Sequence, residues 1–188
     1  IGITDAIRPT SAGAIRELKV MGIQPVLLSG DRRETAELVA HAVGIDRVLA
    51  EVRPEEKAER VAALQREGQF VAMVGDGIND APALAQADIG IAIGAGTDVA
   101  IEAAQVVLMR SDPADIARAI RLSKATVRKM KQNLAWASVY NVLAIPVAAG
   151  AFYPSLGWSL RPEVSALLMS VSSIIVALNA VSLRRARI

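Results

Sequence analysis

Two long stretches near the end of the chain carry no charged residue, and they limit the folds that are open to it. Residues 134–153 and 164–183 are each 20 residues of mostly apolar sequence. A helix rises about 1.5 Å per residue, so each stretch is long enough to cross the roughly 30 Å hydrocarbon core of a bilayer. We therefore predict a hairpin of two transmembrane helices. A pair of buried core helices in a large soluble protein is the alternative.

The charges around the two stretches predict their orientation. Basic residues precede the first stretch and follow the second: Lys124, Arg128, Lys129, Lys131, Arg184, Arg185 and Arg187. Only Arg161 lies in the connecting turn. Because positive residues stay on the cytoplasmic side, we expect the preceding domain and the C-terminus to be cytoplasmic. The predicted location is the plasma or inner membrane, which the protein crosses more than once.

Composition excludes some other classes of protein. The net charge is only +2, and the basic residues flank apolar stretches, so a nucleic-acid partner is not expected. The chain has no cysteine, so it can form neither disulfides nor thiolate metal sites by itself. It starts at Ile1 without an initiator methionine, from which we expect a fragment of a longer protein.

Helix and strand patterns alternate over the rest of the chain. Apolar runs predict short strands at 25–28, 48–52, 70–74, 88–93 and 105–109. Helical spacing predicts helices at 9–21, 54–67 and 97–104, and one that ends at Ala42 and begins with an Asp31–Glu34 capping box. Asp112 and Pro113 are expected to cap the helix that leads to the hairpin. Strands separated by helices predict an α/β fold with a parallel, doubly wound sheet.

These patterns divide the chain into three parts. Residues 1–111 are expected to form the α/β domain, residues 112–132 a helical connection, and residues 133–188 the transmembrane hairpin. The two spans are placed at about 134–153 and 164–183.

An acidic loop follows the strand at 70–74. Asp76 lies between two glycines, and Asn79 and Asp80 follow within one turn. Open α/β sheets bind ligands at the carboxyl ends of their strands, and clustered oxygen ligands suit Mg²⁺ beside a phosphate. This loop is therefore the predicted magnesium site, although it contains no obvious nucleophile.

Two further segments are candidates for the same site. Ser29 and Gly30 follow another strand and offer a hydroxyl and backbone amides to phosphate oxygens. Lys57, early in its helix, is a point cation for the same oxygens. The alternatives are an ordinary turn with a helix cap at Ser29–Asp31 and a solvated helix residue at Lys57.

Polar residues also lie within the predicted spans. They include Tyr140, Asn141, Ser170, Ser172, Ser173 and Asn179. Such groups are costly in hydrocarbon unless they face a partner or a pathway. Taken singly, each serine is expected to help the helices pack. Taken together, Tyr140–Asn141 and the segment 169–173 fit a translocation site at least as well as they fit helix packing.

The motifs of the predicted α/β domain, in their order along the chain, resemble those of the phosphorylation domain of P-type ATPases, which belong to the haloacid dehalogenase-like superfamily. Residues 74–84 (VGDGINDAPAL) match that family's hinge motif, residues 29–31 (SGD) resemble its TGD motif, and residues 53–57 (RPEEK) resemble its lysine segment. The resemblance implies that Asp76 and Asp80 hold Mg²⁺, with Asn79 organising metal and phosphate. It implies that Ser29 and Lys57 contact the phosphoryl group, with Gly30 and Asp31 shaping the site.

The hairpin resembles that of heavy-metal-transporting P-type ATPases. Residues 133–150 contain the Tyr140–Asn141 pair of their seventh helix, and residues 169–173 (MSVSS) are similar to the eighth helix of the Cu(I)-transporting subgroup. The resemblance implies that Tyr140, Asn141, Met169 and Ser173 bind transported Cu(I), and a thioether suits this soft ion. In the subgroup assigned to Cu(II), the residue that corresponds to Ser173 is threonine. Zinc pumps are expected to have a lysine and an aspartate in these helices, and both are absent here.

The resemblance implies an ATP-driven Cu(I) export pump, of which this chain is the C-terminal part. The family's phosphorylated aspartate lies in a DKTGT motif, which this sequence lacks, as it lacks the Cys-Pro-Cys helix. The ATP site is expected to lie mostly outside this chain, and the chain alone is expected to be inactive. The implied partners are the lipid bilayer, the metal ion and the rest of the pump, and a copper chaperone is a further candidate.

Three other functions stay open. The transported ion is Ag(I), Cu(II) or Zn²⁺ in one alternative. In another, the protein is a membrane-anchored phosphatase of the same superfamily, but its nucleophile would have to be Asp5, whose surroundings fit poorly. A non-catalytic membrane scaffold would leave all of these motifs to coincidence.

Overall fold

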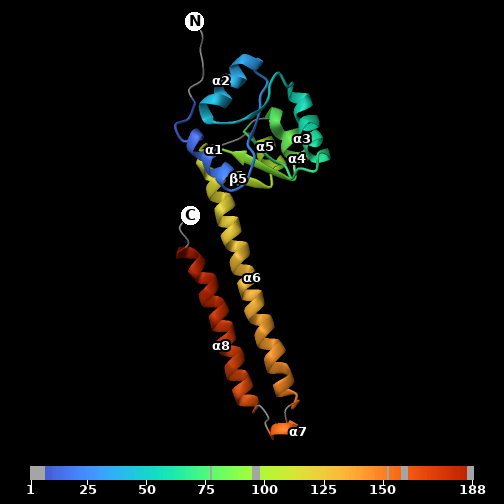
Figure 1. The fold of residues 1–188 in the computed structure, drawn as a ribbon, viewed down its shortest axis with the longest axis vertical. Helices are drawn as coiled ribbons and strands as arrows, with labels where there is room; N and C mark the ends of the chain where they lie inside the picture. Colours follow the sequence, from blue (N-terminus) through green and yellow to red (C-terminus); the bar gives the residue numbers. More distant parts are fainter. Residues whose placement is uncertain (1–6, 77, 95–97, 152, 158–160, 186–188) are drawn as a thin grey trace. The chain divides into compact units, whose positions relative to one another are not determined.

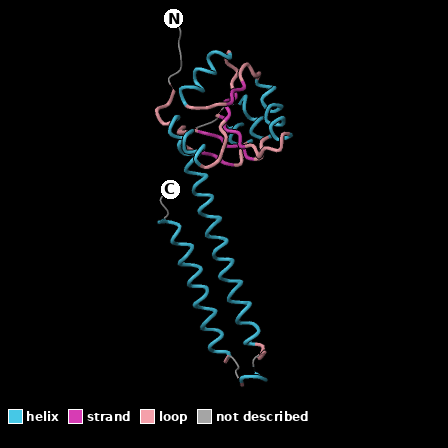
Figure 2. The backbone as a smooth tube through the Cα atoms, viewed as in Figure 1, coloured by secondary structure: helices cyan, strands magenta, loops and turns pink. Residues whose placement is uncertain are grey.

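The computed structural model describes residues 7–185 except 77, 95–97, 152 and 158–160 (Figure 1). The chain divides into two compact units, which comprise residues 1–118 and 119–188. Among the described residues, all strands lie in the first unit, whereas helices make up the regular structure of the second (Figure 2).

The first unit alternates short strands with helices, as the sequence predicts. Its strands are β1 (Val26–Leu28), β2 (Arg47–Leu49), β3 (Ala72–Gly75), β4 (Ile89–Ile93) and β5 (Val106–Leu108). Its helices are α1 (Ser11–Val20), α2 (Arg33–Val43), α3 (Lys57–Arg66), α4 (Ala81–Gln86) and α5 (Asp98–Ala103), with 3-10 turns η1 (Pro54–Glu56) and η2 (Ile78–Asp80). The helix α6 (Ala114–Ala148) begins here and continues into the second unit.

All strand pairs are parallel, but the strands form two sheets instead of one. β1 pairs with β2, and β4 lies between β3 and β5. Within the described residues, no ladder joins β1 to β3, so each of them has one free edge. The parallel α/β class is therefore confirmed, and the division of the sheet is a feature that the hydrophobic pattern does not reveal.

Burial follows this division of the sheet. β4, which is paired on both sides, has its central residues buried, whereas β1 is only half-buried and β3 is buried only at Gly75. A small cluster of Val61, Ala83 and Ala87 packs against Val71 and Met73. Alanine dominates the buried residues, so α3 and α4 approach the sheet closely.

Two details that we predicted from the sequence near the first sheet are wrong. The predicted Asp31–Glu34 capping box is wrong, because α2 begins after Arg32 and no side chain caps it. β2 ends at Leu49 and not at 52, since Glu51 adopts a left-handed backbone conformation with φ of 58°. This conformation is uncommon for a residue other than glycine, and it turns the chain out of the strand.

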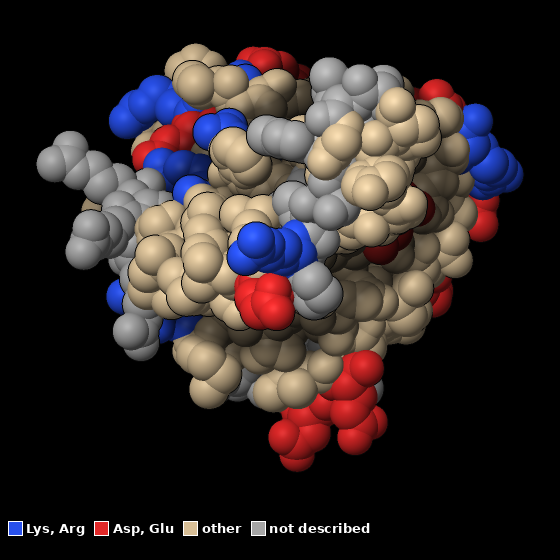
Figure 3. All heavy atoms as spheres, turned by 90° about the horizontal axis from the view of Figure 1, so that it is seen from below, with Lys and Arg blue, Asp and Glu red and all other residues tan. Residues whose placement is uncertain are grey.

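The second unit consists of α6, the short α7 (Tyr153–Leu156), α8 (Pro162–Val181) and the 3-10 turn η3 (Ser182–Arg185). Many apolar side chains of α6 and α8 are exposed, among them Leu134, Leu143 and Leu167. In the view from below, uncharged residues cover most of the near surface (Figure 3). Within the described residues, which exclude the side chains of Tyr140 in α6 and of Pro162 and Ser165 in α8, no helix is long and apolar enough to span a membrane.

Candidate functional site

Ser29 and Asp31 form one polar pair after β1. The Ser29 hydroxyl donates to the Asp31 carboxylate at 2.9 Å and accepts from the Asp31 backbone N–H at 3.1 Å. The Ser29 backbone continues the ladder, since its N–H donates to the Leu49 carbonyl and its carbonyl accepts from the Val52 N–H. This loop is therefore held by the backbone while its carboxylate stays exposed.

Glu51 is a part of this region that sequence reasoning missed. Its N–H donates to the Asp31 carbonyl at 2.9 Å, and its left-handed conformation aims the chain back toward that loop. A left-handed glutamate stores strain of about 1 kcal/mol, which the surrounding structure must offset. No composition or periodicity signal marks such a residue, because only glycine and asparagine are typical of this conformation.

The acidic loop begins where β3 ends. Gly75 is buried, and a Cβ atom at this position would lie 2.6 Å from the Asp80 Cβ and 2.8 Å from a carboxylate oxygen of Asp80. Only glycine therefore permits Asp80 to fold back against the end of the strand. Asp76 and Asn79 are exposed, and Gly77 lies outside the described residues.

Lys57 and Asp80 form an ion pair across the two sheets. The Lys57 Nζ donates to Asp80 Oδ1 at 2.7 Å, and the two side chains are only 17% and 14% exposed. Lys57 opens α3 after the η1 turn, and Asp80 closes η2. Sequence reasoning placed both residues in one site, and the structure brings them into direct contact, because the segments after β2 and β3 converge there.

No hydrogen bond or ion pair of the described residues links the Ser29–Asp31 pair directly to the Lys57–Asp80 pair. The two are joined by the backbone, because Val52 hydrogen-bonds to Ser29 and leads through η1 to Lys57. The carboxyl ends of β1 and β3 thus each carry a carboxylate and a second polar group. This arrangement presents both negative and positive charge to a ligand at the carboxyl ends of the strands.

The donor set fits magnesium better than a larger protein-only metal cage. Within the part of the chain that is described, no group of three or more His, Cys, Asp or Glu residues is placed to hold an ion. Mg²⁺ is commonly bound through one or two carboxylates, with waters and phosphate oxygens completing six ligands. Asp76 and Asp80 supply that number of carboxylates, and Asp80 is held in place by Gly75 and Lys57.

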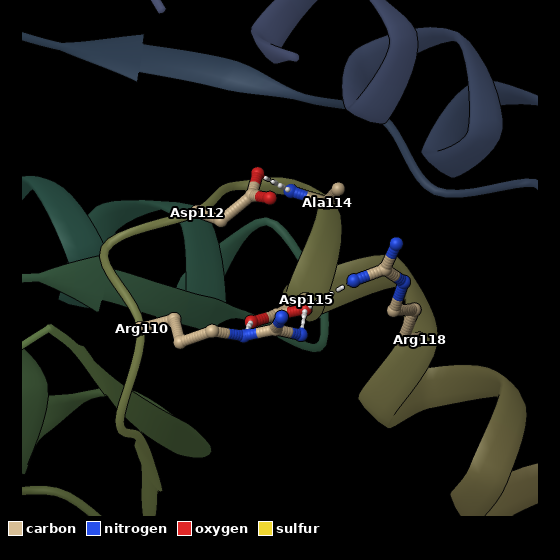
Figure 4. A network of polar contacts seen from close by, with 5 residues as sticks. All are labelled: Arg110, Asp112, Ala114, Asp115 and Arg118. Atoms are coloured by element: carbon tan, nitrogen blue, oxygen red, sulfur yellow. Dashed lines mark hydrogen bonds and ion pairs between the residues drawn. The ribbon is translucent and has the colours of Figure 1, made fainter.

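A second polar network lies where β5 leads into α6 (Figure 4). Asp115 accepts from Arg110 at 2.7 and 2.9 Å and from Arg118 at 2.8 Å. Asp112 accepts from the Ala114 N–H at 3.0 Å, so the predicted cap of this helix is present. Hydrogen bonds from Arg110 and from the Ala114 backbone lower the pKa of Asp115 and of Asp112, respectively.

Three of the predicted copper ligands in the second unit, Asn141, Met169 and Ser173, have exposed side chains. Met169 is 66% exposed. The Ser173 hydroxyl donates to the Met169 carbonyl at 3.1 Å, within its own helix. The side chain of Tyr140 lies outside the described residues. The structure therefore places Met169 and Ser173 one turn apart without bringing them together with Asn141 through a contact.

Comparison with known proteins covers both units. Family models for haloacid dehalogenase-like hydrolases match residues 1–88 and 57–120. The copper-exporting P-type ATPase B of Archaeoglobus fulgidus is 56% identical over 184 residues, which is 98% of this chain and 26% of that protein. The copper-exporting P-type ATPase of Vibrio cholerae is 53% identical over 188 residues, or 100% of this chain and 20% of that protein.

A solved structure agrees with these relatives. A zinc-transporting PIB-type ATPase in its E2.Pi state matches with a TM-score of 0.81 at 33% identity, covering 96% of this chain and 28% of that one. The chain spans about a quarter or less of the length of the relatives it matches. The similarity nevertheless extends over nearly all of its residues, including α6 and α8.

Proposed function

The chain belongs to the P-type ATPases and is homologous over nearly its whole length to those that transport copper; from this premise we propose that it is part of an ATP-driven Cu(I) export pump. In this proposal the first unit supplies the Mg²⁺-binding half of the phosphorylation site. The second unit supplies part of the transmembrane copper site. ATP binds mostly outside this chain.

The observation that carries the proposal is the Lys57–Asp80 ion pair, whose aspartate lies in the loop that follows the parallel strand β3 and also contains Asp76. Asp76 and Asp80 would hold Mg²⁺, which when bound neutralises charge on a phosphoryl group. Lys57 and the Ser29 hydroxyl bind phosphoryl oxygens, because one is a cation and the other a donor. Gly30, Asp31 and Asn79 orient these groups.

The reacting aspartate lies outside this chain in the proposal, since no DKTGT sequence is present. The free edges of β1 and β3 support this view, because both strands are less buried than the fully paired β4. We place a strand from elsewhere in the pump between them, ending in the aspartate. Its carboxyl end would then lie between Ser29 and Asp76, as phosphoryl transfer requires.

The membrane part of the proposal concerns α6 and α8. It is supported by the charge-free stretches 134–153 and 164–183, by the basic residues that flank them and by the exposed apolar side chains. Both ends of the hairpin and the first unit are cytoplasmic in this arrangement. Residues 1–111 form the phosphorylation domain, 112–132 the connection and 133–188 the hairpin.

Cu(I) is the proposed transported ion, with Tyr140, Asn141, Met169 and Ser173 as ligands. The Met169 thioether is the one soft donor among them, and this chain offers no cysteine. The exposure of Met169 and Asn141 is what a site completed by helices outside this chain requires. Ag(I), Cu(II) or Zn²⁺ remain the alternative cargoes.

Phosphorylation of the intact protein tests the proposal. We expect ATP to form a hydroxylamine-sensitive phosphoenzyme that Cu(I) stimulates, because an acyl phosphate is cleaved by hydroxylamine. Asp76→Ala and Lys57→Met should reduce its formation at least about a hundredfold. The matched control is Asp46→Asn, an exposed carboxylate that pairs with Lys19. A phosphoenzyme that forms normally in Asp76→Ala contradicts the proposed site.

A further inference from the structure

A polar cluster joins α6 to α8 away from the proposed copper ligands. Asn179 of α8 accepts from the Lys129 Nζ at 2.8 Å, and its amide nitrogen donates to Asn133 Oδ1 at 2.7 Å. All three side chains are half-buried. We call Lys129, Asn133 and Asn179 the clasp.

The chemistry of the clasp permits only one arrangement of the Asn179 amide. A lysine ammonium donates and never accepts, so the Asn179 oxygen must face Lys129 and its nitrogen must face Asn133. Separately from this amide, the Ser182 hydroxyl donates to the backbone carbonyl of Asn179 at 2.6 Å. Both ends of this amide are thus occupied by partners on the other helix, which fixes its rotamer as well as its position.

The clasp lies on the seam between the two helices. In α6 the half-buried positions include 129, 133, 137, 144 and 147, and among the described side chains of α8 they are 172, 176 and 179. This spacing of three and four residues is typical of one helix face packed against another. Apart from the clasp and Ser172, the residues at these positions are alanine and valine. Small apolar side chains give little specificity of register, so the polar contact is the feature that sets it.

The register that the clasp sets aligns the proposed ion ligands. The two helices run in opposite directions, so a step forward from Asn133 corresponds to a step back from Asn179. Asn141 is eight positions after Asn133, and Val171 is eight positions before Asn179. Met169 and Ser173 lie on either side of Val171. Asn141 therefore lies level with the 169–173 segment, about 12 Å along the helices from the clasp.

We infer that Lys129, Asn133 and Asn179 are positioning residues, which hold Asn141 level with Met169 and Ser173 by fixing the register of α6 against α8. This inference rests on the proposed function, because it gives those ligands a common ion. A slip of one residue moves a side chain by about 1.5 Å along the axis and rotates it by about 100°. Such a slip separates ligands that must meet on one ion.

The dependence of ATP hydrolysis on Cu(I) concentration, measured in the intact protein, distinguishes a positioning role of the clasp from a purely stabilising one. Asn179→Leu leaves a lysine unpaired, whereas the triple variant K129M/N133L/N179L replaces the whole clasp by apolar groups of similar volume. Such full replacement is often neutral for stability. We expect both variants to raise the Cu(I) concentration for half-maximal ATP hydrolysis about tenfold or more, as loss of supporting contacts does at other metal sites.

Two variants complete this experiment. Asn179→Asp keeps an acceptor for Lys129 and for the amide of Asn133, so it should retain near wild-type ion dependence. Gln132→Leu, an exposed neighbour of Asn133, is the matched control and should change nothing. A triple variant that melts and responds to Cu(I) like the wild type overturns the inference, since the clasp is then packing alone.

A register measurement does not depend on the identity of the ion. Ala137 and Val176 are half-buried on the seam, one turn from the clasp, and can be replaced by cysteines. We expect this pair to cross-link in membranes and to do so at least about fivefold more slowly when Asn179→Leu is added. If Cu(I) does not stimulate ATP hydrolysis by the wild type, but Asn179→Leu still slows cross-linking, the proposed function is wrong and the role of the clasp in setting the register is supported. Equal rates of cross-linking with and without Asn179→Leu contradict the role of the clasp in setting the register.

Discussion

At the residue scale, the acidic loop depends on one missing side chain. Gly75 admits the Asp80 carboxylate to the end of β3, and Lys57 then holds that carboxylate by an ion pair of low exposure. The sequence predicted Asp76, Asp80 and Lys57 as members of one site from motif positions. It did not predict the Lys57–Asp80 contact, because 23 positions of chain separate the two residues and their distance depends on tertiary packing.

Replacing Gly75 tests this account of the loop. Gly75→Ala places a Cβ within 2.6 Å of the Asp80 Cβ, so Asp80 must move and lose its contact with Lys57. We expect the free energy of unfolding to fall by about 1–3 kcal/mol, as for overpacking in other cores. Calorimetry and Mg²⁺ titration of the full chain measure the two effects, and weaker Mg²⁺ binding should accompany the lower stability.

A second glycine provides the control. Gly13 lies within α1 and has no atom within 4 Å of the position where a Cβ would be built. Gly13→Ala should therefore stabilise the chain by about 0.5–1 kcal/mol, because alanine favours a helix interior. If Gly75→Ala is as harmless as Gly13→Ala, the close approach of Asp80 is not a constraint.

At the element scale, the start of α6 is fixed by charge. Asp112 accepts from the first turn of the helix, and Asp115 lies between Arg110 and Arg118 (Figure 4). The sequence predicted this cap because an Asp-Pro pair opens a helix in a recognisable way. It did not predict the two arginine contacts of Asp115, which depend on how the chain leaves β5.

The pH dependence of unfolding tests this network. The hydrogen bond from Arg110 holds the folded pKa of Asp115 below the usual aspartate value of 3.8, so the contribution of Asp115 to stability is complete well above pH 3.8. That contribution is lost as the pH falls through 3.8 and then through the lower folded pKa. We expect the melting temperature of the wild type to fall more steeply between pH 5 and about pH 3 than that of Asp115→Asn.

The control for this prediction is Glu55→Gln, which alters an exposed carboxylate of η1. Its melting curve should remain parallel to that of the wild type over the same pH range. Equal slopes for the wild type and Asp115→Asn would show that the arginine contacts of Asp115 do not affect stability.

At the scale of the whole molecule, the sequence predicted the class of fold but not the pairing of its strands. Apolar runs located each strand that the structure describes to within a few residues, because each run is short and bounded by turn residues. The split between β1 and β3 depends on which strands can reach one another, and that is not encoded in any single run. The clasp was missed for the same reason, since Lys129 and Asn179 lie 50 positions apart.

The free edges of the two sheets give a prediction for the intact protein. If a strand from outside this chain pairs with β1 and β3, the backbone amides of those strands should exchange with deuterium more slowly in the intact protein than in this chain alone. β4 serves as the internal control, because it is already paired on both sides. Exchange that slows equally in β4, or in no strand, would contradict an inserted strand.

The central claim is that the two units belong to one machine that moves Cu(I) with ATP. ATP-driven uptake of Cu(I) into inside-out membrane vesicles that contain the intact protein tests it most directly. The account predicts Cu(I) uptake that requires ATP and Mg²⁺ and that is lost in both Asp76→Ala and Met169→Ala, since each removes one half of the coupling. Uptake of Zn²⁺ in place of Cu(I), or Cu(I) uptake that survives Asp76→Ala, would contradict it.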